Sequence, residues 1–235
     1  MSEIKVWTQW SDLNAPPGIT LLSPENFPLD SSDLSQIDFY VPTYMTGAKG
    51  LSYVEKMTNL KVLQMPNAGY EDALAHLRPG LTLCNATGVH DASTAELAVG
   101  LAIASRRGFA EFMKDQNDGI WNHRRFPSLS DSKVGIVGFG SIGKEIAKKL
   151  SVFDVEVTAF TQSGRDGSLK VEELDKHLPN LDIVILILPL TDTSRHMFDA
   201  PRLSKMKDGA LLINMARGPV VVTDALVAEL QTKRL

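Results

Sequence analysis

Residues 138–143 carry the glycine spacing that a phosphate-binding turn requires. They read Gly-Phe-Gly-Ser-Ile-Gly and stand between the apolar run 134–137 and a segment of helical periodicity. In a strand–turn–helix unit, the first glycine permits a tight turn, the second lets backbone N–H groups approach a pyrophosphate, and the third lets helix and strand pack closely. The helix N-terminus adds unpaired donors and a positive dipole end. The segment predicts a dinucleotide site, with these residues binding the cofactor: Gly138, Gly140, Ser141 and Ile142.

The end of the next expected strand, 155–160, bears on the choice of coenzyme. An acidic residue there would bind the ribose hydroxyls of NAD, but no carboxylate occurs before Asp166. Thr161, Ser163 and Arg165 could instead bind the 2′-phosphate of NADP. We therefore expect NADP(H) in preference to NAD(H), an ordinary polar turn being the alternative. A methyltransferase with a glycine loop is disfavoured because it too would need the acidic residue.

Short apolar runs alternate with helix-patterned segments along the whole chain, which predicts an α/β fold with parallel strands. The expected strands are 4–7, 38–41, 62–65, 81–84, 133–137, 155–160, 183–188 and 210–214. The expected helices include 47–56, 71–77, a long one at 92–117, and 223–235. The polar segment 122–133 is interpreted as a passage between two domains.

The composition excludes several classes of protein. The 235 residues carry a net charge of −4, which gives no electrostatic reason to expect nucleic acid or an anionic membrane. One cysteine, Cys84, rules out an internal disulfide and offers no metal cluster. The longest apolar run, 183–188, is too short to span a bilayer, and the first residues lack a signal-peptide pattern. We expect a cytoplasmic protein without a metal.

Four segments, taken in order, resemble the D-isomer-specific 2-hydroxyacid dehydrogenases. Besides the glycine turn they are 67–69 (Asn-Ala-Gly), 85–96 (from Asn-Ala-Thr-Gly to Ser-Thr-Ala-Glu), and the pair 188–193 (Leu-Pro-Leu-Thr-Asp-Thr) and 213–219 (Ile-Asn-Met-Ala-Arg-Gly-Pro). The likeness covers residues 60 to 235 well, and the earlier residues only through the order of their elements.

The resemblance implies a Rossmann-type doubly wound parallel sheet preceded by a flavodoxin-like substrate domain, with the active site in the cleft. We place the substrate domain, lacking its C-terminal return, at 1–98, and the NAD(P)-binding domain, incomplete at its C-terminal end, at 99–235. Family members usually pair through their cofactor domains, so we expect a homodimer.

The implied reaction passes a hydride between nicotinamide and a small 2-keto or 2-hydroxy acid, acting on the CH–OH group. Arg217 matches the family's substrate arginine, and its planar fork of donors suits an α-keto acid; a surface arginine is the alternative. The backbone of the loop Asn67, Ala68 and Gly69 would hold the substrate carboxylate. The resemblance adds cofactor contacts at these residues: Thr94, Leu188, Pro189, Thr193, Met215 and Ala216.

The family's catalytic glutamate and histidine lie further along the sequence than residue 235, so the chain is expected to be C-terminally truncated. Its five histidines, which are His76, His90, His123, His177 and His196, match no catalytic position. Losing an acid/base group commonly lowers a rate by on the order of a hundredfold to ten-thousandfold. The alternative function is therefore a non-catalytic dinucleotide-binding or corepressor-like module, or an inactive fragment.

Overall fold

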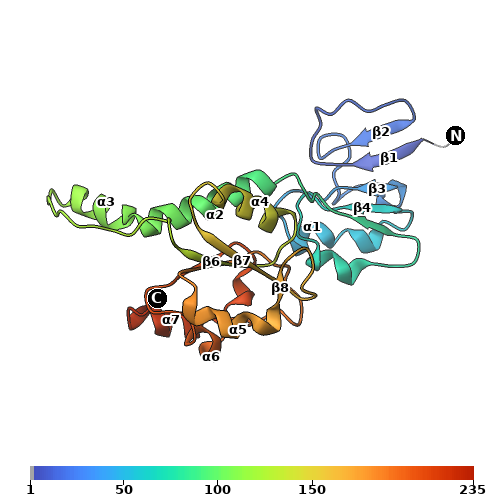
Figure 1. Ribbon diagram of the computed structural model, residues 1–235. Helices are drawn as coiled ribbons and strands as arrows, with labels where there is room; N and C mark the ends of the chain where they lie inside the picture. Colours follow the sequence, from blue (N-terminus) through green and yellow to red (C-terminus); the bar gives the residue numbers. More distant parts are fainter. Residues whose placement is uncertain (1–2) are drawn as a thin grey trace. The chain divides into compact units, whose positions relative to one another are not determined.

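The computed structural model describes residues 3–235, which form two compact units divided between His90 and Asp91. Each unit contains one five-stranded sheet in which all strands are parallel (Figure 1). The expected domain boundary after residue 98 falls inside helix α2 (Asp91–Arg106), whereas the division between the units coincides with the start of that helix.

The sheet of the first unit has the strand order β2-β1-β3-β4-β5. This is the flavodoxin-like order, as predicted. Its strands are β1 (Ile4–Trp7), β2 (Ile19–Leu22), β3 (Phe39–Tyr40), β4 (Val62–Gln64) and β5 (Thr82–Cys84). Its helices are α1 (Ala48–Leu51) and the 3-10 helices η1 (Leu34–Gln36), η2 (Val54–Lys56) and η3 (Glu71–His76).

The sheet of the second unit has the order β10-β9-β6-β7-β8. When the strands are numbered from β6 and the sheet is read from β8 to β10, this is the Rossmann order 3-2-1-4-5, which confirms the predicted fold class. The strands are β6 (Lys133–Val137), β7 (Glu156–Thr161), β8 (Leu169–Lys170), β9 (Ile183–Leu186) and β10 (Leu211–Asn214). The helices are α2, α3 (Phe109–Asn117), α4 (Ser141–Leu150), η4 (Val171–Glu173), α5 (Leu174–His177), η5 (Leu178–Asn180), α6 (Ala200–Leu203), η6 (Gly218–Val220) and α7 (Thr223–Gln231).

Helices cover both faces of this second sheet, with α2 and α4 on one side and α5 and α6 on the other (Figure 1). The side chains of strand β9 show how the two faces are packed. Ile183 and Ile185 pack into one apolar cluster with residues of α2 and α4. Val184 and Leu186 point to the other face and join a cluster with residues of α5 and α6. All four side chains are buried, as expected for a parallel strand between two helical layers.

The expected long helix at 92–117 is wrong, because two helices occupy that range. Gly108 separates α2 from α3 with a φ of 64°, in the left-handed region that favours glycine. A Cβ at this position would lie 2.3 Å from the ring of Phe126. Beyond this break, helix α3 projects away from the sheet, with the returning chain beside it (Figure 1).

Other local expectations also need correction. The segment 122–133, interpreted as a passage between domains, lies wholly within the second unit. The expected helix at 47–56 divides into α1 and η2, and the 71–77 segment is a 3-10 helix. Strands β2 and β8 were not predicted. None of the helices formed by residues 3–235 has the length and apolar character needed to cross a membrane.

Candidate functional site

The glycine turn between β6 and α4 has the geometry that its spacing predicts. Gly138 has a φ of 105°, and a Cβ there would lie 2.2 Å from the carbonyl oxygen of Ile187. A Cβ on Gly143 would lie 2.3 Å from the carbonyl oxygen of Gly138. Both positions exclude a side chain, the first because of a left-handed turn beside β9 and the second because α4 packs against the turn.

Gly140 differs from its two neighbours in facing open space. Apart from its own chain neighbours, no atom lies within 4 Å of the position that its Cβ would take, and its φ of −77° is open to any residue. It precedes the ten-residue helix α4 without offering a side-chain cap, so the first N–H groups of the helix are left for an external acceptor. Ser141 is exposed and Ile142 half-buried at this end. The turn can therefore accept a pyrophosphate against its backbone.

The loop after β9 lies at the same end of the sheet as the glycine turn, and hydrogen bonds of Ser194 hold its shape. This buried hydroxyl donates to the carbonyl of Pro189 at 2.7 Å and accepts from the N–H of Thr191 at 2.7 Å. Leu188 is half-buried, whereas Pro189 and Thr193 are exposed. Ser194 was missed in the sequence, although a threonine followed three residues later by a serine is a recognisable signal for such a turn.

The loop after β10 carries Arg217, Met215 and Ala216. Asn214 closes it by donating to the carbonyl of Arg217 at 2.9 Å and accepting from the N–H of Ala216 at 3.0 Å. The Arg217 side chain is exposed, and one guanidinium nitrogen donates to the carbonyl of Ala216 at 3.0 Å. Met215 and Ala216 are half-buried. Parallel β6, β9 and β10 bring all these loops to one edge of the sheet, where ligands bind in open α/β folds.

The loop between β7 and β8 holds the residues expected to contact the 2′-phosphate. Ser163 and Arg165 are exposed. The hydroxyl of Thr161 instead serves the loop itself, since it accepts from the N–H of Gly164 at 3.0 Å and lies 2.7 Å from the hydroxyl of Ser168. Thr161 therefore shapes the loop from within, and Ser163 and Arg165 are presented to solvent.

The first unit contains the loop Asn67–Gly69, which follows β4. Two of its backbone carbonyls accept hydrogen bonds: the N–H of Ala86 donates to the carbonyl of Asn67, and the side-chain amide of Asn85 donates to the carbonyl of Ala68, both at 2.9 Å. Within residues 3–235, no hydrogen bond from the backbone N–H of Ala68 or Gly69 is present, and the buried Oδ1 of Asn67 has no partner. The loop can thus offer backbone donors to an anion.

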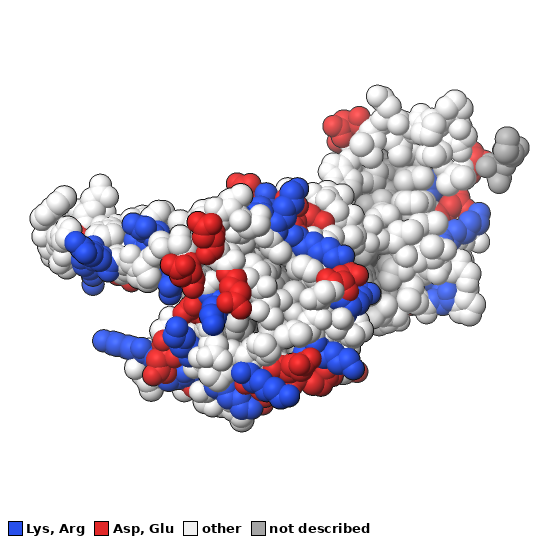
Figure 2. All heavy atoms as spheres, in the orientation of Figure 1, with Lys and Arg blue, Asp and Glu red and all other residues white. Residues whose placement is uncertain are grey.

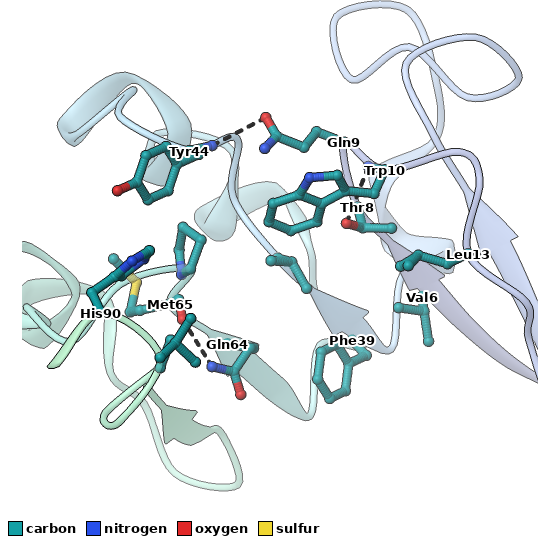
Figure 3. Close-up of a pocket in the computed structure, with 14 residues that line it drawn as sticks. Val6, Thr8, Gln9, Trp10, Leu13, Phe39, Tyr44, Gln64, Met65 and His90 are labelled. Atoms are coloured by element: carbon teal, nitrogen blue, oxygen red, sulfur yellow. Dashed lines mark hydrogen bonds between the residues drawn. The ribbon is translucent and has the colours of Figure 1, made fainter. Parts of the chain in front are cut away.

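A separate pocket of about 660 Å³ also lies in the first unit (Figure 3). Trp10, Leu13 and Phe39 line one part, and the rings of Tyr44 and His90, whose centroids are 5.8 Å apart, line another. Its wall is mainly apolar, and residues 67–69 do not contribute to it. The pocket therefore does not supply the anion-binding chemistry expected of that loop.

Thr94, the last of the predicted cofactor contacts, and two of the histidines lie outside these loops. Thr94 is half-buried in the first turn of α2. His177 packs its ring edge-on against Phe160, with 5.4 Å between centroids, and His76 pairs with Glu55 at 3.1 Å. On the face of the second unit drawn in Figure 2, acidic and basic side chains are interspersed.

Comparison with known proteins agrees with this arrangement. Residues 99–235 match the family model of the D-isomer specific 2-hydroxyacid dehydrogenase NAD binding domain. The chain is 31% identical over 182 residues to hydroxypyruvate reductase of Thermotoga maritima, covering 75% of this chain and 60% of the relative. It is 35% identical over 187 residues to glyoxylate reductase of Thermofilum pendens, covering 74% of this chain and 55% of the relative.

The chain thus spans little more than half the length of these curated relatives. Its fold is similar to that of a D-isomer specific 2-hydroxyacid dehydrogenase family protein from Aeromonas salmonicida. The TM-score is 0.84 and the identity 22%, with 100% of this chain and 79% of the other covered.

Proposed function

Because the chain belongs to the D-isomer specific 2-hydroxyacid dehydrogenase family, we propose that the protein is an NAD(P)-dependent oxidoreductase acting on a small 2-keto or 2-hydroxy acid. The observation that carries the proposal is the turn at Gly138–Gly143. Two of its glycines are fixed by close packing, and the third leaves open space before the N-terminus of α4. This division of roles is the one that dinucleotide-binding turns require.

The bound nicotinamide coenzyme would supply or accept the hydride. The residues of this chain would bind and orient it, with the pyrophosphate at Gly140, Ser141 and Ile142. The loops after β9 and β10 support further contacts from Leu188, Pro189, Thr193, Met215 and Ala216, since Ser194 and Asn214 hold these loops in fixed shapes. Thr94, in the first turn of α2, completes the proposed set.

Preference for NADP(H) over NAD(H) follows from the loop after β7. Ser163 and Arg165 are exposed there and supply a hydroxyl and a cation suited to a 2′-phosphate. Thr161 acts through the shape of the loop, because its hydroxyl is engaged by Gly164 and Ser168.

Two groups of hydrogen-bond donors in this chain suit the carboxylate and carbonyl oxygens of a small 2-keto acid. The loop Asn67–Gly69 offers backbone N–H groups suited to a carboxylate. Arg217 offers a planar guanidinium, which can recognise the carboxylate and carbonyl oxygens together and polarise the carbonyl toward hydride attack. Glyoxylate and hydroxypyruvate, the substrates named for the two relatives above, are therefore the first to test.

The test is oxidation of NADPH by the chain with either keto acid, followed by nicotinamide absorbance, alongside calorimetric binding of NADPH. We expect Arg217→Gln to bind NADPH normally but to lower kcat/KM by on the order of a hundredfold or more, the usual cost of losing one charge-stabilising donor. Arg107→Gln, which removes an exposed guanidinium just beyond α2, is the matched control and should leave both unchanged. NADPH binding without any oxidation would instead support a non-catalytic dinucleotide-binding module.

We also infer a homodimer formed through the second unit. The projecting segment 109–126, here called the arm, presents exposed apolar side chains: Phe109, Phe112, Met113, Ile120 and Trp121, the last 94% exposed. Clustered apolar side chains of this kind typically mark an interface. The arm has its own internal packing, because the rings of Phe112 and Phe126 lie edge to face at 5.2 Å and Arg124 pairs with Asp115.

Light scattering after gel filtration tests the dimer. The double variant Met113→Glu/Trp121→Glu should be monomeric, while Lys148→Glu, a surface change on α4, should remain dimeric. A wild-type monomer at micromolar concentration would contradict this part of the proposal and leave the reaction untouched.

A further inference from the structure

Lys144 and Asp166 join two segments of the proposed coenzyme site. Lys144 follows Gly143 in the first turn of α4, and Asp166 belongs to the loop between β7 and β8. The Nζ of Lys144 lies 2.8 Å from Oδ2 of Asp166, close enough for a charge-assisted hydrogen bond. The ion pair therefore links the helix that receives the pyrophosphate to the loop expected to receive the ribose end.

The loop that carries Asp166 is held by hydrogen bonds of its own. Asp166 has a φ of 56°, a left-handed conformation uncommon for residues with a side chain, and it lies between Arg165 and Gly167. The hydroxyl of Ser168 donates to the carbonyl of Arg165 at 2.6 Å and lies 2.7 Å from the hydroxyl of Thr161. The loop is thus ordered by its own contacts and by Lys144.

The Lys144–Asp166 ion pair contributes little to the stability of the fold. The two side chains are 52% and 49% exposed, and ion pairs in such positions contribute little because water and salt screen them. A lysine in the first turn of a helix also opposes the helix dipole. The hydrogen bond from Lys144 favours the charged form of Asp166 and lowers the pKa of this carboxyl.

The charge of Asp166 affects coenzyme binding because its loop follows β7, the second strand of the Rossmann sheet. A carboxylate near the carboxyl end of the second Rossmann strand bonds the ribose hydroxyls of NAD, whereas the 2′-phosphate of NADP is repelled by it. Asp166 is the first carboxylate after β7, five residues beyond Thr161. Lys144 neutralises it, and the net charge that remains in the loop comes from Arg165.

We propose that the Lys144–Asp166 ion pair sets coenzyme preference, with Lys144 acting as a positioning residue that masks the Asp166 carboxylate and so favours a 2′-phosphorylated coenzyme. This inference rests on the proposed function, since it concerns the same coenzyme site. Without Lys144, the carboxylate is free to repel a 2′-phosphate and to accept hydrogen bonds from ribose hydroxyls. Coenzyme preference then shifts toward NAD(H).

The experiment measures the Kd of NADPH and of NADH by calorimetry for the wild-type chain and four variants. Lys144→Gln should reduce the preference for NADPH, expressed as the ratio of the two Kd values, by on the order of tenfold, as expected for an unmatched charge near a phosphate. Lys148→Gln removes the same charge from the same helix, where the partner is Glu145 at 3.6 Å, and should leave the ratio within about twofold.

Variants without the Asp166 carboxylate distinguish two explanations for the effect of Lys144→Gln: an unmasked carboxylate, or the loss of a positive charge near the coenzyme. Lys144→Gln/Asp166→Asn should regain most of the wild-type ratio, and Asp166→Asn alone should keep it. A double variant as impaired as Lys144→Gln, or a Lys144→Gln ratio equal to that of the wild type, would overturn the inference while leaving the proposed function intact. Failure of the wild-type chain to bind either coenzyme would overturn the proposed function itself.

Discussion

At the scale of single residues, the three glycines of the turn have separate physical roles. Gly138 and Gly143 have no room for a Cβ, because backbone oxygens would lie 2.2 and 2.3 Å away. Gly140 has room, and its space is the space proposed for the pyrophosphate. Fold and binding should therefore respond differently to the same substitution at different glycines.

We expect Gly143→Ala to destabilise the protein by about 1–3 kcal/mol, because the added methyl forces α4 away from the turn. Gly140→Ala should change the free energy of unfolding by no more than about 1 kcal/mol, the usual scale of a change at a helix start. Chemical denaturation of both variants checks this. Equal destabilisation at the two positions would show that Gly140 is also closely packed.

At the scale of elements, charged side chains at the amino ends of the strands help to hold the second sheet. Asp182 accepts from the backbone N–H of Lys133 at 2.8 Å and from Nζ of Lys207 at 2.7 Å, which ties the start of β6 to the residue before β9. Burial favours the neutral form of this carboxyl, but the two hydrogen bonds and the positive charges of Lys207 and Arg106 together outweigh burial and hold its pKa below the ordinary value.

Because the pKa of Asp182 is lower in the folded state, its contribution to stability is present at neutral pH and is lost as the pH falls below about 4. Asp182→Ala should cost about 1–3 kcal/mol at pH 7. The difference from wild type should shrink progressively in acid. Asp208→Ala, at an aspartate that is 86% exposed, is the matched control and should show neither effect. A penalty for Asp182→Ala that is independent of pH would refute this explanation.

The arm depends on the break at Gly108. We expect Gly108→Ala to disturb α3 and the returning segment, because its φ is positive and the methyl would meet the ring of Phe126. Hydrogen exchange should accelerate in 109–126 but not in β6 or β9. Gly100→Ala, in α2 with no atom within 4 Å of the added Cβ, is the control. Unchanged exchange in the arm would contradict the role given to Gly108.

The glycine turn and most of the strands were predictable from local sequence pattern, whereas the order of the strands followed only from the resemblance to the dehydrogenase family. Buried β6 and β9 are continuous apolar runs, and the glycines mark the turn by spacing alone. The break at Gly108 was not predictable, because a helical pattern tolerates one glycine and the clash with Phe126 involves a residue 18 positions later in the chain. The Lys144–Asp166 pair was missed for the same reason, since the fold joins two distant segments.

At the scale of the whole molecule, each compact unit has its own apolar core. In the first unit, Trp7, Tyr40 and Leu63 pack together, whereas the second has clusters on both faces of its sheet. Cores of this kind support independent folding. All residues proposed to bind the coenzyme belong to Asp91–Leu235.

The segment Asp91–Leu235 expressed alone should therefore fold cooperatively and bind NADPH within about threefold of the Kd of the whole chain, a difference well below 1 kcal/mol. Circular dichroism during heating and calorimetry together check this. A fragment that folds but has lost NADPH binding would show that residues 1–90 contribute to the coenzyme site.

The most direct measurement of the central claim, that the turn at 138–143 binds the pyrophosphate of the coenzyme, is calorimetric titration of NADPH into the wild-type chain and into Gly140→Asp. The account predicts saturable binding of one NADPH per chain. It also predicts that the variant, which keeps the fold by circular dichroism, loses binding because its carboxylate occupies the phosphate position. Absence of binding to the wild type, or equal binding by both proteins, would contradict it.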